Sequence, residues 1–152
     1  MNQVALITGA SRGIGRGVAL ELAAAGWDLV VNFASNQTAA EDTVKCSVEQ
    51  AKLAGHEIRA EICKGDIAQS ADRDRLVSFV RNQFGRLDLL VNNAGITSIG
   101  RADLLEASEE NWDALMAVNL KGPFFLSQLV GSWMIEQNNM NDSWRGKIIN
   151  IS

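Results

Sequence analysis

Short apolar runs alternate along the whole chain with longer segments of helical periodicity. The apolar runs, at residues 4–8, 29–33, 58–63, 87–92 and 147–151, have the length and the β-branched content of strands. The runs at 87–92 and 147–151 are apolar almost without interruption, which is typical of strands buried on both faces of a parallel sheet. The pattern therefore predicts five strands with helical segments between them.

The segments between the predicted strands carry apolar residues at every third or fourth position, as on one face of a helix. In the first segment these are Ile14, Val18 and Leu22, and Gly26 follows as a natural C-terminal stop. The second and third segments show the same spacing, at Val44, Val48, Ala51, Leu76, Val80 and Phe84.

The fourth predicted helix is the longest and covers about residues 108–137. Ser108 is a favourable N-cap, and the two glutamates that follow it suit the positive end of a helix. Pro123 lies inside this helix and cannot donate a hydrogen bond to the carbonyl of Asn119, four residues earlier. We expect that carbonyl to be freed from the helix ladder, the plainer alternative being a kink or a helix that restarts near residue 122. The polar stretch 138–146 predicts a surface loop.

Five strands that alternate with four helices predict right-handed βαβ units and a parallel sheet covered on both faces. The fold class is therefore α/β. The 152 residues contain no repeat and no linker, so we expect a single domain over residues 1–152. A last strand at 147–151 would leave an open sheet edge, and we expect this domain to be C-terminally incomplete.

Composition and charge exclude several classes of function. The chain has 14 basic and 18 acidic residues, interspersed along its length, and a net charge of −4, which argues against nucleic acid or an anionic membrane as its partner. No apolar run reaches the roughly 20 residues of a membrane span, and we expect no signal peptide. Cys46, Cys63 and His56 form no zinc-ligand pattern, so no metal site is predicted.

These residue types favour structural roles in a cytosolic protein. We expect the two cysteines to be reduced and the histidine to be exposed. Four tryptophans are predicted to be packing residues rather than a ligand box, namely Trp27, Trp112, Trp133 and Trp144.

The stretch TGASRGIG, residues 8–15, connects the first predicted strand to the first predicted helix. A helix N-terminus offers free N–H groups and a positive partial charge, and both attract a pyrophosphate. Gly9, Gly13 and Gly15 follow GxxxGxG spacing rather than GxGxxG. This context favours a dinucleotide site, and a tight strand-to-helix turn without a ligand is the alternative.

The residues that follow the second predicted strand indicate which dinucleotide, NAD or NADP, the site would bind. Folds that prefer NAD place an acid there to bind the ribose 2′-hydroxyl, but this chain reads NFASN at 32–36 and has none. Arg12, within the glycine turn, carries a planar charged fork that suits a phosphate. We predict NADP(H) over NAD(H), the alternative for Arg12 being a side chain that faces water.

Five motifs together carry a resemblance to a known family. They are TGASRGIG (8–15), KGDI (64–67), NNAG (92–95), VNLKGPFF (118–125) and IINIS (148–152). In order and spacing they resemble the classical short-chain dehydrogenase/reductase family. Within this family, the stretches VALITGASRGIG (4–15) and RLDLLVNNAGIT (86–97) resemble the 3-oxoacyl-(acyl-carrier-protein) reductase type. The resemblance implies a doubly wound parallel sheet, the Rossmann fold, of which this chain is the N-terminal five-strand portion, in the order 3-2-1-4-5.

The resemblance also implies roles for particular residues. Asp66 would hold the adenine ring, the alternative being a surface carboxylate in a turn. Arg12 and Ser35 would contact the 2′-phosphate, and Asn119 would be catalytic, its main chain holding a water in a proton relay. The implied cofactor-binding residues are Gly9, Ser11, Arg12, Gly13, Ile14, Gly15, Asn32, Ser35, Asp66, Ile67, Asn93, Ala94 and Gly95.

The implied reaction is hydride transfer between NADP(H) and a carbonyl or alcohol, and the substrate we expect first is a 3-oxoacyl thioester of fatty acid synthesis. The implied assembly is a cytoplasmic homotetramer. The family's proton donor is the tyrosine of a Tyr-x-x-x-Lys motif, assisted by a serine, yet this chain contains no tyrosine. We expect a chain cut before the catalytic Ser, Tyr and Lys, and therefore inactive by itself. A naturally short, non-catalytic NADP(H)-binding or sensing protein is the competing hypothesis, and a flavodoxin-like domain is disfavoured by NNAG and Asp66.

Overall fold

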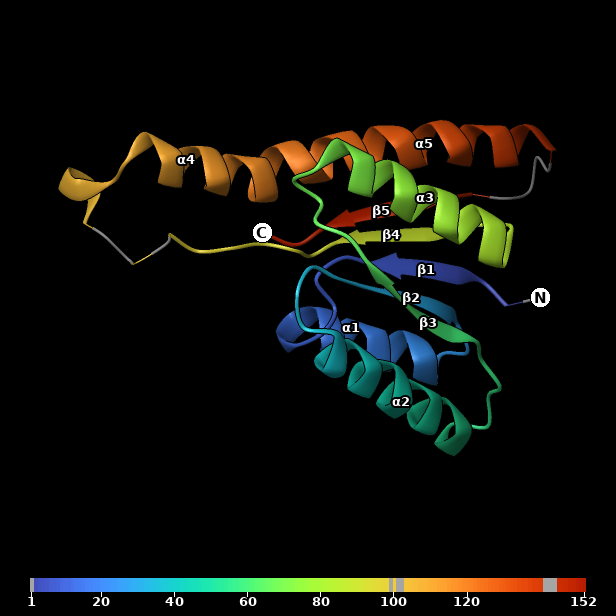
Figure 1. Ribbon diagram of the computed structural model, residues 1–152. Helices are drawn as coiled ribbons and strands as arrows, with labels where there is room; N and C mark the ends of the chain where they lie inside the picture. Colours follow the sequence, from blue (N-terminus) through green and yellow to red (C-terminus); the bar gives the residue numbers. More distant parts are fainter. Residues whose placement is uncertain (1, 99, 101–102, 141–144) are drawn as a thin grey trace.

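The described strands form one parallel sheet at the centre of the molecule. The computed structural model describes residues 2–98, 100, 103–140 and 145–152, and within them the sheet has five strands in the order β3-β2-β1-β4-β5 (Figure 1). The strands are β1 (Val4–Ile7), β2 (Asp28–Phe33), β3 (Ala60–Lys64), β4 (Leu89–Asn92) and β5 (Lys147–Asn150). Every pairing is parallel, so the predicted α/β class, doubly wound arrangement and strand order are confirmed.

The helices cover both faces of this sheet. Figure 1 shows α1 and α2 on one face and α3 and α5 on the other. The helical elements are α1 (Gly13–Ala24), α2 (Gln37–Leu53), α3 (Ser70–Phe84), the 3₁₀ turn η2 (Leu104–Glu106), α4 (Glu109–Met116), the π-helical turn η3 (Ala117–Lys121) and α5 (Gly122–Met140).

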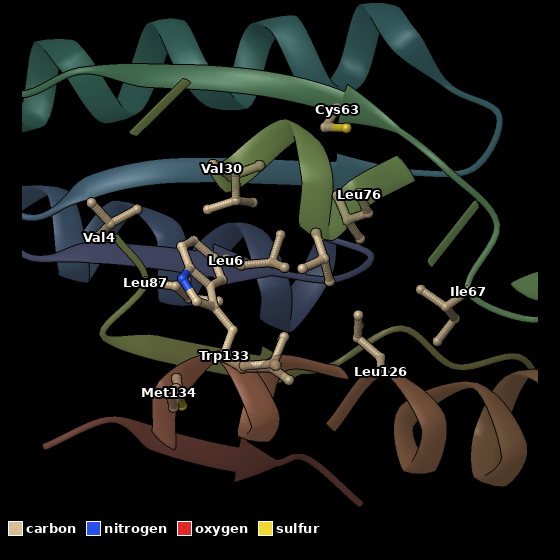
Figure 2. Packing of buried hydrophobic residues seen from close by; sticks show 14 residues of the cluster. Val4, Leu6, Val30, Cys63, Ile67, Leu76, Leu87, Leu126, Trp133 and Met134 are labelled. Atoms are coloured by element: carbon tan, nitrogen blue, oxygen red, sulfur yellow. The ribbon is translucent and has the colours of Figure 1, made fainter. Parts of the chain in front are cut away.

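Alternate residues of β1 divide the hydrophobic core into two layers. Val4 and Leu6 point to the side of α3 and α5, where they join Trp133 of α5 in one buried cluster (Figure 2). Ala5 and Ile7 point to the opposite side and pack with small residues of α1 and α2. Because side chains alternate along a strand, each of the central strands contributes to both layers.

The long fourth helix is interrupted, contrary to the prediction of one helix over 108–137. Ser108 does cap α4, its hydroxyl accepting a hydrogen bond from Asn111 N–H at 3.3 Å. The π turn at 117–121 then separates α4 from α5, and the Gly122 N–H donates to the Ala117 carbonyl, five residues back. Pro123 is the second residue of α5, where a missing N–H costs little.

The helix restart near residue 122 is thus the alternative that the structure supports, and the freed Asn119 carbonyl stays a prediction. The predicted loop at 138–146 is also displaced, because α5 continues to Met140. Residues 141–144 of that stretch lie outside the described residues.

Two predictions of burial are wrong. Trp112 is 61% exposed, because α4 lies past the carboxyl ends of the strands and has no sheet beneath it (Figure 1). β5 is exposed along its length, because it is an edge strand paired with β4 on one side. Trp133 and Trp27 do pack against the two core layers, whereas Trp144 lies outside the described residues.

The histidine and cysteines match their predicted structural roles. His56 is exposed, and both cysteines are free thiols. Cys63 is buried in the core, and this burial raises the pKa of its thiol to about 11.

Candidate cofactor-binding site

A cleft of about 710 Å³ opens at the carboxyl ends of the strands. Its walls come from the residues that directly follow β1, β2, β3 and β4, which is where open α/β sheets bind their ligands. Of the thirteen residues predicted to bind the cofactor, twelve line it: Gly9, Ser11, Arg12, Gly13, Ile14, Asn32, Ser35, Asp66, Ile67, Asn93, Ala94 and Gly95. The remaining one, Gly15, is buried inside α1 against the side chain of Asn93.

The glycine turn is joined to the segment after β4 through Thr8. The buried Thr8 Oγ1 accepts hydrogen bonds from the backbone N–H groups of Asn93 and Ala94, both at 3.0 Å. Asn93 Nδ2 donates in return to the carbonyls of Thr8 and Gly9, at 2.9 and 3.2 Å. Thr8 begins the TGASRGIG motif, but its role as an acceptor could not be predicted from the sequence, because its partners are 85 and 86 residues away along the chain.

Gly9 is required where these two segments meet. Its φ of +63° is in the left-handed region, and a Cβ at this position would lie 2.8 Å from the Cα of Ala94. The glycine therefore has a structural role as well as a place on the cleft wall. The tight-turn interpretation and the ligand interpretation of TGASRGIG are compatible.

The first turn of α1 faces the cleft without a side-chain cap. Arg12 occupies the N-cap position, makes no capping hydrogen bond and is exposed. The backbone N–H groups that begin α1 are thus available to an anion, and the guanidinium of Arg12 stands beside them on the cleft wall. This combination fits a phosphate group.

Asn32 at the end of β2 has its side chain engaged within the protein. Its Oδ1 accepts from Gly9 N–H at 3.3 Å, and its Nδ2 donates to the carbonyls of Cys63 and Gly65 at 3.2 and 3.0 Å. Asn32 therefore connects the segments that follow β1 and β3. Beyond it, Ser35 is exposed on the cleft wall, and no acid stands between β2 and α2.

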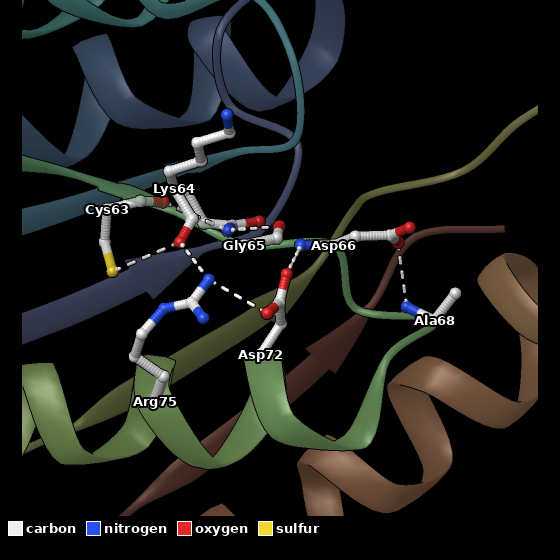
Figure 3. A network of polar contacts seen from close by, with 8 residues as sticks. Cys63, Lys64, Gly65, Asp66, Ala68, Asp72 and Arg75 are labelled. Atoms are coloured by element: carbon white, nitrogen blue, oxygen red, sulfur yellow. Dashed lines mark hydrogen bonds and ion pairs between the residues drawn. The ribbon is translucent and has the colours of Figure 1, made fainter.

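Asp66 lies in a polar network after β3 (Figure 3). Its Oδ1 accepts from Ala68 N–H at 2.9 Å, and its own N–H donates to Asp72 Oδ2 at 2.8 Å. Asp72 also pairs with Arg75 at 2.9 Å. The hydrogen bond from Asp66 N–H, followed by the charge and hydrogen bond of Arg75, lowers the pKa of Asp72.

Asn119 lies at a second cleft, of about 610 Å³, which Ser127, Asn150 and Ser152 also line. Ala94 lines both clefts. The Asn119 side chain holds the backbone of Ile96, its Oδ1 accepting from the N–H and its Nδ2 donating to the carbonyl, both at 2.9 Å. The structure therefore brings the predicted catalytic asparagine next to Ala94, one of the predicted cofactor-binding residues, whereas the glycine turn does not line this second cleft.

The parallel sheet, its strand order and the helices on both faces define an α/β domain of the Rossmann type. The model of the family described as "short chain dehydrogenase" matches residues 3–152, and the chain belongs to this family of oxidoreductases.

Individual relatives agree with this assignment. The 3-oxoacyl-(acyl-carrier-protein) reductase FabG of Staphylococcus epidermidis is 41% identical over 155 residues, covering 100% of this chain and 57% of that protein. A metagenomic short-chain oxidoreductase, solved in complex with NADP, is 36% identical with a TM-score of 0.79, covering 99% of this chain and 62% of the other. Acetoin dehydrogenase from Enterobacter cloacae is 32% identical with a TM-score of 0.82, and the match covers 100% of this chain and 55% of the other.

The chain spans about half the length of the curated relatives it matches, 53% of one and 57% of another. Within the described residues, no helix combines the length and the apolar character needed to cross a membrane.

Proposed function

We propose that this chain forms the cofactor-binding part of an NADP(H)-dependent reductase that transfers a hydride between the cofactor and a carbonyl or alcohol. The observation that carries the proposal is the composition of the cleft wall. Arg12 and Ser35 stand on it, and Asp66 is its one carboxylate among the described lining residues. A site for a 2′-phosphate needs a cation and no acid after β2, and the cleft meets both requirements.

The residues fit a dinucleotide at several positions. The uncapped start of α1 would provide a cradle for a pyrophosphate. Asp66 would accept a hydrogen bond from the adenine amino group, and Asn93 to Gly95 would line the nucleotide. The bound nicotinamide supplies the hydride chemistry. Asn119 would contribute through its main-chain carbonyl, by holding a water that relays a proton.

The substrate proposed first is a 3-oxoacyl thioester of fatty acid synthesis, supported by the 41% identity to the staphylococcal 3-oxoacyl reductase. We further propose that residues 1–152 are one dinucleotide-binding domain, and that the whole protein works as a cytoplasmic homotetramer. The 152 residues by themselves are proposed to bind nucleotide without turnover, because a tyrosine proton donor is missing from them.

A non-catalytic NADP(H)-binding or sensing protein is the second candidate. The absence of tyrosine from the 152 residues favours it, because the family's proton donor is a tyrosine. A reductase assay with NADPH, on the chain alone and on any longer protein that contains it, separates the two. Turnover by the longer protein supports the reductase, and nucleotide binding without turnover by both supports the sensor.

The proposed cofactor preference is tested by calorimetric titration of the purified chain with NADPH and NADH. We expect tighter binding of NADPH, and we expect Arg12→Met to weaken that binding by about tenfold or more, since a hydrogen bond to a charged group contributes about 1.5–3 kcal/mol. Arg81→Met removes an exposed guanidinium from α3, away from the cleft, and is the control that should leave both affinities unchanged. NADH binding as tight as NADPH would contradict the proposed cofactor.

A further inference from the structure

Two consecutive residues of α3 hold the segment of the cleft wall that contains Asp66. Asp72 Oδ2 accepts the Asp66 N–H at 2.8 Å, and an Nη atom of Arg73 donates to the carbonyl of Ile67 at 2.7 Å. Both ends of the two-residue segment 66–67 are therefore fixed by side chains of opposite charge. Together these two contacts restrain the backbone that carries the Asp66 carboxylate.

Arg73 is an unusual residue for its position, because it is only 5% exposed. Among the described residues no carboxylate forms an ion pair with it. Its guanidinium contacts the Phe125 ring, 5.6 Å from the ring centre, and the Ile67 carbonyl. Burial of an unpaired cation is costly, so stability alone favours an apolar side chain here. What the guanidinium adds is a directed hydrogen bond to the cleft wall.

The Ile67 carbonyl is also the point where α5 meets this wall. A Cβ at Gly122, the first residue of α5, would lie 2.8 Å from the Ile67 oxygen. Arg73 contacts the same helix through Phe125. The carbonyl is therefore held between α3 and α5 and has little freedom to move when Arg73 is in place.

We propose that Arg73 is a positioning residue that acts through Asp66 and makes the cleft selective for adenine over other purine bases. The proposal rests on the proposed function, that this cleft binds the nucleotide. Asp66 Oδ1 is already committed to Ala68 N–H, so the direction of the carboxylate follows the backbone of the segment that Arg73 holds. A loosened segment lets the carboxylate turn away from the base.

Selectivity follows from the chemistry of a fixed carboxylate. The adenine amino group donates a hydrogen bond to it, whereas hypoxanthine has a carbonyl oxygen at the same position and would be repelled. A mobile carboxylate would neither attract the adenine amino group nor repel the hypoxanthine carbonyl oxygen. Loss of Arg73 should therefore lower the preference between the two bases more than the affinity for the phosphates.

The experiment compares binding of adenosine 2′,5′-bisphosphate and inosine 2′,5′-bisphosphate by calorimetry. We expect the wild-type chain to prefer the adenosine compound, and Arg73→Met to reduce this preference by about tenfold, the effect of one hydrogen bond to a charged group. Arg73→Lys, which keeps a buried donor, should restore part of the preference. Arg81→Met is the matched control, since Arg81 lies on the same helix and over an aromatic ring, that of Trp133, but away from the cleft.

Hydrogen exchange gives a second readout that needs no nucleotide. Arg73→Met should speed exchange of the Asp66 and Ala68 amides, and it should leave the amides of β2 as in the wild type. If exchange rises throughout the core, Arg73→Met is unfolding, and the proposal is then tested by the base preference and the exchange rates of Arg73→Lys. If the wild type binds neither compound, the proposed function fails and exchange alone decides whether Arg73 holds the segment. An unchanged base preference with unchanged exchange would overturn the inference.

Discussion

Replacement of Thr8 by valine tests how the glycine turn is held in place. Thr8 is fully buried, and its hydroxyl accepts from the N–H groups of Asn93 and Ala94 while donating to the Val91 carbonyl at 3.3 Å. Valine has nearly the same shape, so the substitution leaves packing intact and removes only the hydroxyl. Two backbone donors then lose their acceptor.

The expected cost follows from those two donors. A buried donor left without a partner costs about 1–3 kcal/mol, and because both sites are only partly buried we take the lower end, which gives about 2 kcal/mol in the free energy of unfolding. For a chain of this length, each kcal/mol corresponds to about 2–4 °C in Tm. Thr8→Val should therefore lower Tm by about 4–8 °C.

Thr43→Val is the matched control. Thr43 is also fully buried, but its one hydroxyl proton is shared between the carbonyls of Ala39 at 3.0 Å and Ser11 at 3.3 Å, so its loss leaves no N–H without an acceptor. We expect it to cost about 1 kcal/mol or less. The assay is urea unfolding followed by circular dichroism, with Tm from calorimetry. An equal cost for the two variants would show that the bonds to residues 93 and 94 do not hold the turn as described.

Two further predictions concern the helices beside the cleft. Gly122→Ala should destabilise the chain by about 1–3 kcal/mol in urea unfolding, because the added Cβ would meet the Ile67 carbonyl. Gly131→Ala on the same helix, where a Cβ meets nothing within 4 Å, should stabilise the chain by about 0.5–1 kcal/mol. Equal effects of the two substitutions would contradict the packing of α5 on the Ile67 carbonyl. The folded state lowers the pKa of Asp72 below its ordinary value of 3.8, so this carboxylate stabilises the fold above that pH and the contribution is lost as the pH falls through the lowered pKa. Asp72→Asn should therefore be less stable than the wild type near neutral pH, with the difference shrinking below about pH 4 in unfolding measurements, and a difference independent of pH would contradict the assignment.

Periodicity was sufficient to predict the strands, because each of them is a local apolar run in the sequence. All five predicted strands are present, and their order matches the one that the family resemblance implies. The boundaries moved by one to two residues, as at β3, which runs from Ala60 to Lys64 rather than over 58–63. Leu87 and Asp88 are buried like strand residues but lie outside the ladder of β4.

What the pattern could not predict depends on contacts between distant segments. The apolar spacing continues through the π turn at 117–121, so only Pro123 hinted at the interruption. The exposure of Trp112 depends on how far α4 extends past the sheet, and the spacing of apolar residues along a helix carries no information about that distance.

The candidate site divides in the same way. Its glycine turn and NNAG segment are short motifs that are readable in the sequence. The roles of Thr8, Asn32 and Arg73 come from side chains that reach across the fold to other segments of the wall. Arg73 in particular gave no signal in the sequence, because a charged residue on a helix is ordinarily exposed.

Nuclear magnetic resonance gives the most direct test of whether the cleft after β1 to β4 binds the cofactor. Amide shifts of the ¹⁵N-labelled chain would be followed during titration with NADPH. If the cofactor binds there, the changes will saturate and will be largest at Gly9, Gly13, Ala94 and Gly95, with the amides of β5 little affected. Saturable changes located elsewhere, or no changes at millimolar NADPH, would contradict binding in this cleft.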